Sequence, residues 1–557
     1  MFANPSELLA VATLGSQIAV ASASHTPPKF LDRAATVASA GFNRWLVPPC
    51  ALAIHLCIGM AYGFSVFWLP LSRAVGISDP VVCKDMTLAQ AITTTSCDWR
   101  VSDLVWTYTL FFVVLGAAAA LGGSWLERTG PRRAGVVASF CWAGGMGISA
   151  IGISIHQLWL IWLGSGLIGG IGLGLGYISP VSTLIKWFPD RRGMSTGMAI
   201  MGFGGGAMIG SPLADILIKY FTSANGVGVW QTFLVMAAGY FVFMMAGALG
   251  YRVPPEGWTP VGWTAPTTMT TQMSRFDVDL KDAHRTPQFW LIWLVLLLNV
   301  SASIGIIGVA SPMLQEIFGG RLTDAPGVLF TAFDDGQKTA AAAVGAGFVG
   351  MISLFNIGGR FFWAALSDRL GRKRLYAVIL ALGALLYGVA APSLTGGTIG
   401  LFILTFCIIA SMYGGGFATV PAYLADIFGT KYVGAIHGRL LTAWSTAGVL
   451  GPLLVAYIRD ARIAAGVPRD QLYQPIYLIL AGMLVVGFIA NLLVRPVADR
   501  FHMSAEAADG DAALPVGSAA GATGGLDTTA LLAWGAVSLP ISWGIYMTIA
   551  KAVILLK

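Results

Sequence analysis

The chain has 557 residues, of which 56% are hydrophobic and 11% are charged, and its mean hydropathy is +0.74. These values exclude a soluble globular protein and predict an all-α polytopic membrane protein whose surroundings are the lipid bilayer. The net charge of +7 calls for no nucleic-acid partner, because basic residues collect in the cytoplasmic loops of membrane proteins.

The chain opens with residues 1–44, which precede the first apolar run. This segment lacks a basic start and contains Glu7, so it does not have the pattern of a cleaved signal peptide. We expect a cytoplasmic N-terminal extension, or a start codon assigned too far upstream.

Six apolar runs follow, each long enough to cross a hydrocarbon core of about 30 Å. They lie at residues 45–71, 102–126, 134–155, 157–185, 194–221 and 229–251, and together they predict an N-terminal six-helix bundle over residues 45–251. Cys83 and Cys97 both fall between the first two runs, in a loop expected outside the cell. We expect them either to form a disulfide there or to remain free thiols.

A polar stretch at residues 252–286, expected to be a cytoplasmic loop, separates these runs from six more. The second set lies at 288–314, 341–367, 374–392, 397–425, 434–458 and 471–494, and it predicts a C-terminal six-helix bundle over residues 287–495. A flexible linker is expected at 496–528. Residues 529–557 contain a thirteenth run, expected to be an extra transmembrane helix that docks on the bundle or serves as a plain anchor.

The loops differ in charge on the two sides of the membrane. With the N-terminus inside, the inner segments carry roughly twice as many Lys and Arg residues as the outer ones, which is the bias that sets topology. We therefore expect a bacterial inner-membrane protein with a cytoplasmic N-terminus.

The two sets of runs are related by an internal repeat. GSWLERTGPRR (123–133) and AALSDRLGRKR (364–374) follow the second and eighth runs, and Glu127 lies 241 residues before Asp368. An acid followed by arginines in a tight turn can hold a charge network that latches one conformation, although an ordinary basic inside loop has a similar composition. The candidate latch residues are Glu127, Arg128, Gly130, Arg132, Asp368, Arg369, Gly371 and Arg372.

These features resemble the major facilitator superfamily. Its members have twelve helices in two pseudo-symmetric halves, with a G-x-x-x-[DE]-R-x-G-x-[RK] type of loop after helices 2 and 8, and here Ala364 replaces the glycine of the second copy. KWFPDRRG (186–193) and MGFGGGA (201–207) are similar to elements of the oxalate/formate antiporter family. That resemblance implies a secondary transporter that exchanges small carboxylates, with no bound cofactor or metal and no enzymatic activity.

Arg360 is the main candidate for binding substrate. It lies well inside the eighth apolar run, and the position 241 residues earlier is Ala119, so the arginine breaks the repeat. A buried arginine is costly unless an anion compensates it, and its planar fork suits a carboxylate. The resemblance implies the same role, because an arginine on helix 8 binds the substrate carboxylate in that family. The alternative is an arginine that reaches toward the cytoplasm or toward backbone carbonyls near Asn356.

Trp444 marks a departure from the family. The resemblance implies a lysine on helix 11 after a Thr-Ala pair, and this chain reads LLTAWSTAG there. One cation favours a monoanion such as formate, lactate or pyruvate, while oxalate remains possible if another cation reaches the site. Aromatic side chains, which pack in membrane helices or line pockets, could complete it. These candidates are Tyr62, Tyr177, Tyr413, Phe417 and Trp444.

The sequence indicates less clearly whether a proton is transported together with the substrate. No Asp or Glu lies near the middle of an apolar run, whereas His55 does, either as a proton carrier or as a structural histidine. The missing central acid favours anion exchange; proton symport and a non-transporting carboxylate sensor are the alternatives. The sequence contains no H-E-x-x-H, Walker or C-x-x-C motif that would favour an enzyme.

Overall fold

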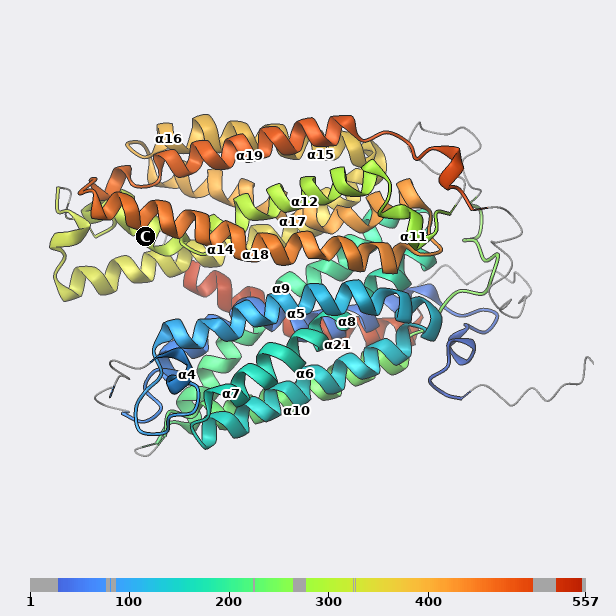
Figure 1. Ribbon diagram of the computed structural model, residues 1–557, viewed down its shortest axis with the longest axis horizontal. Helices are drawn as coiled ribbons and strands as arrows, with labels where there is room; N and C mark the ends of the chain where they lie inside the picture. The colour runs from blue at the N-terminus through green and yellow to red at the C-terminus, as the bar shows by residue number, and fades with distance from the viewer. Residues whose placement is uncertain are drawn as a thin grey trace, which may run out of the picture.

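The computed structural model describes residues 29–76, 81, 87–223, 226–263, 277–323, 325, 327–503 and 527–552. Within them are thirteen helical segments long and apolar enough to cross a membrane, and no β-strand. This confirms the predicted fold class: an all-α integral membrane protein. Figure 1 shows the helices running roughly side by side in two groups.

The first group contains the spans that precede residue 252. Its helices are α2 (Val47–Ile58), extended by η3 (Gly59–Phe67) and α3 (Trp68–Leu71); α5 (Val101–Thr129); α6 (Pro131–Ser154); α7 (Leu158–Ile161), extended by η4 (Trp162–Ile168) and α8 (Gly169–Trp187); α9 (Arg192–Phe221); and α10 (Val229–Gly250). The short α4 (Leu88–Ala91) lies between α3 and α5.

The second group starts after the short α11 (Leu280–Ala283). Its helices are α12 (Pro287–Ile307) with α13 (Ala310–Phe318); α14 (Asp335–Leu370); α15 (Arg372–Leu385), extended by η7 (Leu386–Ala390) and α16 (Ala391–Leu394); α17 (Ile399–Phe428); α18 (Val433–Ala464); and α19 (Gln474–Leu493).

The repeat loops end their helices in the same way. Gly130 directly follows α5 and Gly371 directly follows α14, with φ angles of 90° and 83°. Residues that carry a side chain rarely adopt a backbone with positive φ. Glycine does so readily, and this allows the chain to turn sharply into the next helix. We call the end of the bundle that carries these two turns the predicted cytoplasmic end.

The two groups meet along two helix pairs, α5 with α18 and α9 with α14. The pairs are built alike. A Cβ atom added at Gly197 would lie 2.8 Å from the carbonyl oxygen of Arg360, and one added at Gly438 would overlap the carbonyl oxygen of Ala119. Because each glycine and each carbonyl is 241 residues from its counterpart, the repeat seen in the sequence is also a repeat of the interface.

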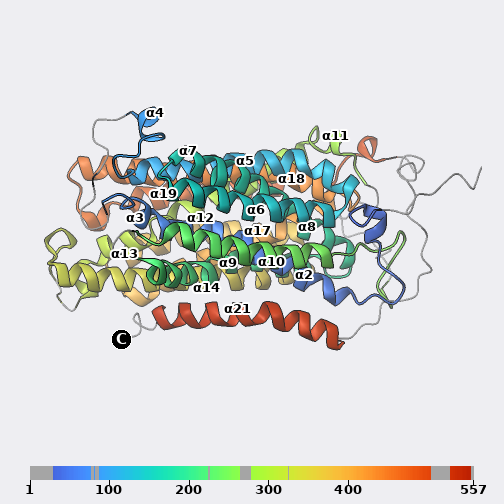
Figure 2. The same ribbon diagram turned by 90° about the horizontal axis from the view of Figure 1, so that it is seen from below.

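The thirteenth span, α21 (Thr528–Ala552), lies along the outside of both groups, as Figure 2 shows. It contacts α2 and α9 of the first group and α14 of the second. The Trp534 indole donates a hydrogen bond to the carbonyl oxygen of Trp45 at 3.1 Å, and buried Val537 packs on Leu52.

The close contact at Gly438 leads to a stability prediction. Gly438→Ala should destabilise the protein, because overpacking a tight interface costs about 1–3 kcal/mol, more than the roughly 1 kcal/mol that alanine gains over glycine in a helix. The thermal midpoint of the detergent-solubilised protein should fall. Gly239→Ala is the control, because a Cβ atom there meets nothing within 4 Å. Equal midpoints for the two variants would contradict the prediction.

Candidate functional site

Arg360 lies on α14, where that helix packs against α9, and its side chain is fully buried. Its Nε donates a hydrogen bond to Oδ1 of Asn356 at 3.1 Å, and its Nη1 donates to the carbonyl oxygen of Ile200 at 3.2 Å. The Nη2 atom has no hydrogen-bond partner, and no carboxylate pairs with the guanidinium in the described part of the chain. The site therefore contains a buried positive charge with unused donor capacity.

Aromatic rings enclose this guanidinium. Its central carbon lies 5.8 Å from the ring centroid of Phe203 on α9 and 5.6 Å from that of Phe417 on α17. The electron-rich ring faces stabilise the cation without neutralising it. The charge thus remains available to an anion.

Trp444 and Tyr177 extend the aromatic wall. The Trp444 ring on α18 lies 5.5 Å from Phe203 and 5.0 Å from Phe417, and the Tyr177 ring on α8 lies 5.4 Å from both Phe203 and Trp444. Both side chains are fully buried. Rings from the two halves of the chain therefore form one cluster around Arg360.

Tyr62 and Tyr413 complete the cluster. Tyr62 on η3 contacts the ring of Phe203 at 5.0 Å, and Tyr413 on α17 contacts that of Phe417 at 6.4 Å. Their hydroxyl groups share a 3.2 Å hydrogen bond that joins the two halves. All six side chains predicted for substrate binding therefore lie together.

Two further donors in the cluster are unused. The Tyr177 hydroxyl and the Trp444 Nε1 are buried and, like Arg360 Nη2, have no hydrogen-bond partner among the described residues. An ionised carboxylate is an acceptor without donors, so it matches this set of groups. No cluster of His, Cys, Asp and Glu suited to a metal ion occurs in the described ranges.

Phe203 is a member of the cluster that sequence reasoning missed. It contacts Tyr62, Tyr177 and Trp444 as well as Arg360. Its position within MGFGGGA, a motif already singled out, was the available signal. The glycines of this motif drew attention to it, and no separate role was predicted for its aromatic residue.

The first repeat loop contacts the other half through a carboxylate. Glu127 accepts hydrogen bonds from the backbone N–H of Gly434 at 3.1 Å and from the Ser182 hydroxyl at 3.1 Å, and it pairs with Lys186 at 2.6 Å. Gly434 belongs to the start of α18. The contact therefore ties α5 to the second half.

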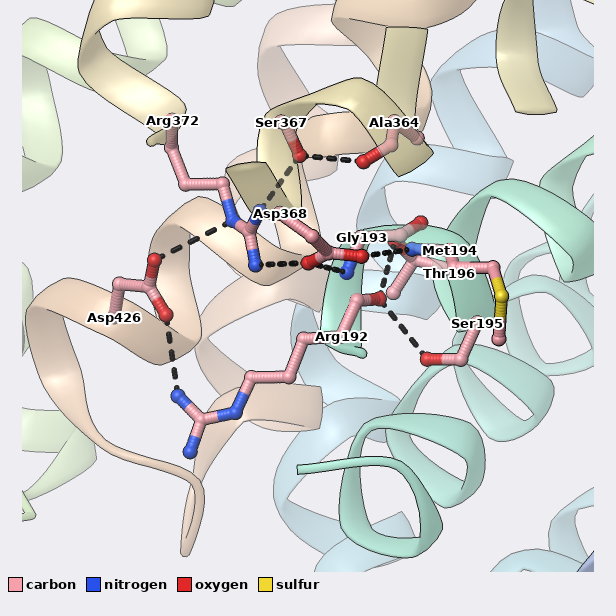
Figure 3. Close-up of polar contacts among 10 residues, drawn as sticks. All are labelled: Arg192, Gly193, Met194, Ser195, Thr196, Ala364, Ser367, Asp368, Arg372 and Asp426. Atoms are coloured by element: carbon pink, nitrogen blue, oxygen red, sulfur yellow. Dashed lines mark hydrogen bonds and ion pairs between the residues drawn. The ribbon is translucent and has the colours of Figure 1, made fainter. Parts of the chain in front are cut away.

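The second repeat loop makes the reciprocal contact, shown in Figure 3. Asp368 accepts hydrogen bonds from the backbone N–H groups of Gly193 and Met194 at the start of α9, both at 2.8 Å. Asp368 and Gly193 are the repeat counterparts of Glu127 and Gly434. The negative carboxylates also suit the positive N-terminal ends of α9 and α18.

Around Asp368 the network contains more charges than the sequence suggested. Arg372 pairs with Asp368 at 2.6 Å and with Asp426 at 3.3 Å, and Asp426 also binds Arg192 at 3.1 Å across the interface (Figure 3). Arg192 and Asp426 were missed because neither lies in a repeat loop. Only the packing of α9 against α14 and α17 brings them together.

The remaining predicted latch residues do not reach the other half. Arg128 and Arg369 are exposed, and Arg128 donates a hydrogen bond to Ser124 on its own helix. Buried Arg132 donates to the carbonyl oxygens of Phe30 and Tyr251, so it holds the N-terminal segment and the end of α10. Its counterpart 241 residues later, Lys373, likewise donates to Val494 just after α19.

Only one of the two cysteines of the predicted disulfide lies among the residues that the structure describes. Cys97 is disulfide-bonded, while Cys83 lies outside the described residues, so their pairing stays a prediction.

Comparison with known proteins gives consistent matches. The Oxalate:formate antiporter of Oxalobacter formigenes is 25% identical over 417 residues, which cover 75% of this chain and 85% of the antiporter. Apicoplast pyruvate carrier 1 of Toxoplasma gondii is 25% identical over 520 residues, which cover 81% of this chain and 89% of the carrier. A crystal structure of the E. coli fucose:proton symporter, FucP, superimposes with a TM-score of 0.54 at 13% identity, covering 81% of this chain and 98% of the symporter.

The family model of the Major Facilitator Superfamily matches residues 51–452 and 336–554. Those matches span most of the chain, and the two groups of helices with their duplicated interface agree with them. The chain belongs to the Major Facilitator Superfamily.

Proposed function

We propose that this transporter exchanges small carboxylates across the membrane by alternating access. The observation that carries the proposal is the buried Arg360 guanidinium, which has no carboxylate partner among the described residues and shares its aromatic cluster with unused donors on Tyr177 and Trp444. A bound carboxylate would neutralise the charge and accept those hydrogen bonds. The names of the two relatives, which refer to oxalate, formate and pyruvate, support the same class of substrate.

Trp444 bears on which carboxylate is preferred. At this position the indole offers one N–H donor and no charge, so Arg360 is the one permanent cation that the described residues bring to the cluster. One positive charge in a low-dielectric site balances a monocarboxylate better than a dianion. The predicted aromatic residues would then exclude water around the bound carboxylate.

The networks around Glu127 and Asp368 are proposed to latch the predicted cytoplasmic end in a closed state. Both carboxylates accept backbone N–H groups from the opposite half, so any separation of the halves at this end must break those hydrogen bonds. Hydrogen bonds to charged groups contribute roughly 1.5–3 kcal/mol each, which is enough to bias a two-state equilibrium.

The distribution of basic residues bears on how the chain lies in the membrane. We infer a bacterial inner membrane with the N-terminus in the cytoplasm, because the basic residues concentrate at the end that carries the two repeat turns. We propose that the two six-helix bundles, residues 45–251 and 287–495, are the two bodies that rock against each other during transport. Helix α21 is proposed to dock on both, through the Trp534 hydrogen bond and the contacts to α9 and α14.

Arg360→Gln tests the substrate site. In liposomes preloaded with formate, pyruvate or oxalate, the wild-type protein should take up labelled carboxylate only when carboxylate is present inside. The variant should lose roughly 10- to 100-fold of that uptake, the equivalent of one charged hydrogen bond. Arg369→Gln on the exposed end of the same helix is the control and should retain uptake. Undiminished uptake by Arg360→Gln would overturn the proposal.

Asp368→Asn tests the latch. An amide accepts the α9 N–H groups more weakly and loses the ion pair with Arg372, so the predicted cytoplasmic end should open more often. The probe is Thr196→Cys, a buried position on α9, in a background without the four free cysteines. A maleimide should label it several-fold faster when Asp368→Asn is present. Arg369→Gln should leave the rate unchanged, and equal rates for all three proteins would refute the latch.

Gly544→Leu tests the docking of α21. A Cβ atom at Gly544 would lie 2.9 Å from Ile209 on α9, so a larger side chain should push the helices apart and lower the thermal midpoint of the protein in detergent. Gly535→Leu is the matched control on the same helix, because a Cβ atom there meets nothing within 4 Å. If α21 does not dock, the two variants should melt alike.

A further inference from the structure

His55 on α2 has an unusual hydrogen-bonding environment. Its ring is fully buried; Nδ1 lies 2.6 Å from the carbonyl oxygen of Ala199, and Nε2 lies 3.2 Å from that of Tyr177. A carbonyl oxygen only accepts, and a neutral imidazole has a single N–H. In the neutral ring one nitrogen lone pair therefore faces an oxygen lone pair, whereas the protonated ring can donate to both carbonyls.

This histidine lies beside the proposed carboxylate site. Its ring stacks on Tyr177 with centroids 5.1 Å apart, and it meets the edge of Phe203 at 6.4 Å. His55 and Arg360 also bind consecutive carbonyls of α9, those of Ala199 and Ile200. The imidazole and the guanidinium thus approach the aromatic cluster from opposite halves of the chain.

The charged and titratable groups that face His55 come from three other helices. They are Arg360 on α14, the Tyr177 hydroxyl on α8 and His437 on α18, which contacts the Tyr177 ring at 5.9 Å. None of them is an acid, and His55 has no carboxylate partner among the described residues. With the site empty, burial is the main effect that disfavours a charged His55, and the like charge of Arg360 adds to it. The two carbonyl acceptors offset part of the cost of burial, and an anion bound next to Arg360 would cancel the repulsion from its charge.

We propose that His55 takes up a proton together with the substrate anion and so supplies the second positive charge of the site. The proton comes from a hydronium ion of the aqueous solution, which becomes water, and binds the ring nitrogen that lacks one. The combined charge of Arg360 and His55 rises from one to two. The protonated site balances a dicarboxylate dianion, and the unprotonated site balances a monocarboxylate. Because linkage is reciprocal, protons strengthen dianion binding as much as the dianion strengthens proton binding.

This inference rests on the proposed carboxylate exchange and is tested in the same liposomes. Uptake of labelled oxalate and of labelled formate is measured from external pH 8 down to pH 5.5. The ratio of oxalate to formate uptake should rise as the pH falls, by up to about tenfold per pH unit, the limit for one bound proton. His55→Gln should flatten this rise, because the amide binds no proton. His437→Gln, the neighbouring buried histidine, is the matched control and should keep the rise.

If His55→Gln does not fold, the variant Trp444→Lys provides a second test. A permanent second cation should raise oxalate uptake at pH 8 and flatten the ratio without changing His55. A wild-type ratio that does not change with pH, a rise that survives in His55→Gln, or a rise lost only in His437→Gln would each overturn the role of His55. Failure of the proposed carboxylate exchange would give a different result from failure of the His55 role. In that case uptake by Arg360→Gln would equal that of the wild type at every pH.

Discussion

The structure depends on the cost of holding the Arg360 guanidinium away from water. A charged group in this position is costly by several kcal/mol, and no carboxylate among the described residues offsets it. What offsets it in part is one side-chain amide oxygen, one backbone carbonyl and two ring faces. These contacts hold the charge in place yet leave it electrostatically uncompensated. An arrangement of this kind keeps a positive charge inside the bundle without a carboxylate partner among the described residues.

Symmetry separates the contacts between the two halves from the aromatic cluster around Arg360. The contacts between the halves are duplicated at an offset of 241 residues, from Gly197 and Gly438 in the helix pairs to Asp368 and Glu127 at the predicted cytoplasmic end. Two bodies that rock about a shared axis need matched surfaces, so duplication suits this role. The binding cluster has no such need. Arg360 and Ala119 occupy equivalent positions, and only one of them bears a charge.

Hydropathy was sufficient to predict the thirteen spans, because each must satisfy its backbone hydrogen bonds internally and cover itself with apolar side chains. Arg360 was also identifiable, since a lone charge within an apolar run is costly wherever the helix packs. Residues that matter through tertiary packing were not. Phe203 and Arg192 lie in the motifs MGFGGGA and KWFPDRRG, but only the crossing of α9 with α14 and α17 gives these residues and Asp426 their partners. The exposure of Arg128 and Arg369 was hidden for the same reason, because a basic loop looks alike whether its side chains point to a partner or to water.

The reciprocal contacts of Glu127 and Asp368 are made to main-chain amides, and this has a consequence for how the protein tolerates change. Every amino acid except proline presents the same N–H group at the start of a helix. The position that donates is nevertheless a glycine in both contacts, because a Cβ atom at Gly193 would overlap the carbonyl oxygen of Ala364 and one at Gly434 would lie 2.5 Å from Oε1 of Glu127. Each contact therefore constrains two positions, an acid on one helix and a residue without a side chain at the start of the other. A substitution on either side breaks the same contact, so the two positions can change only together.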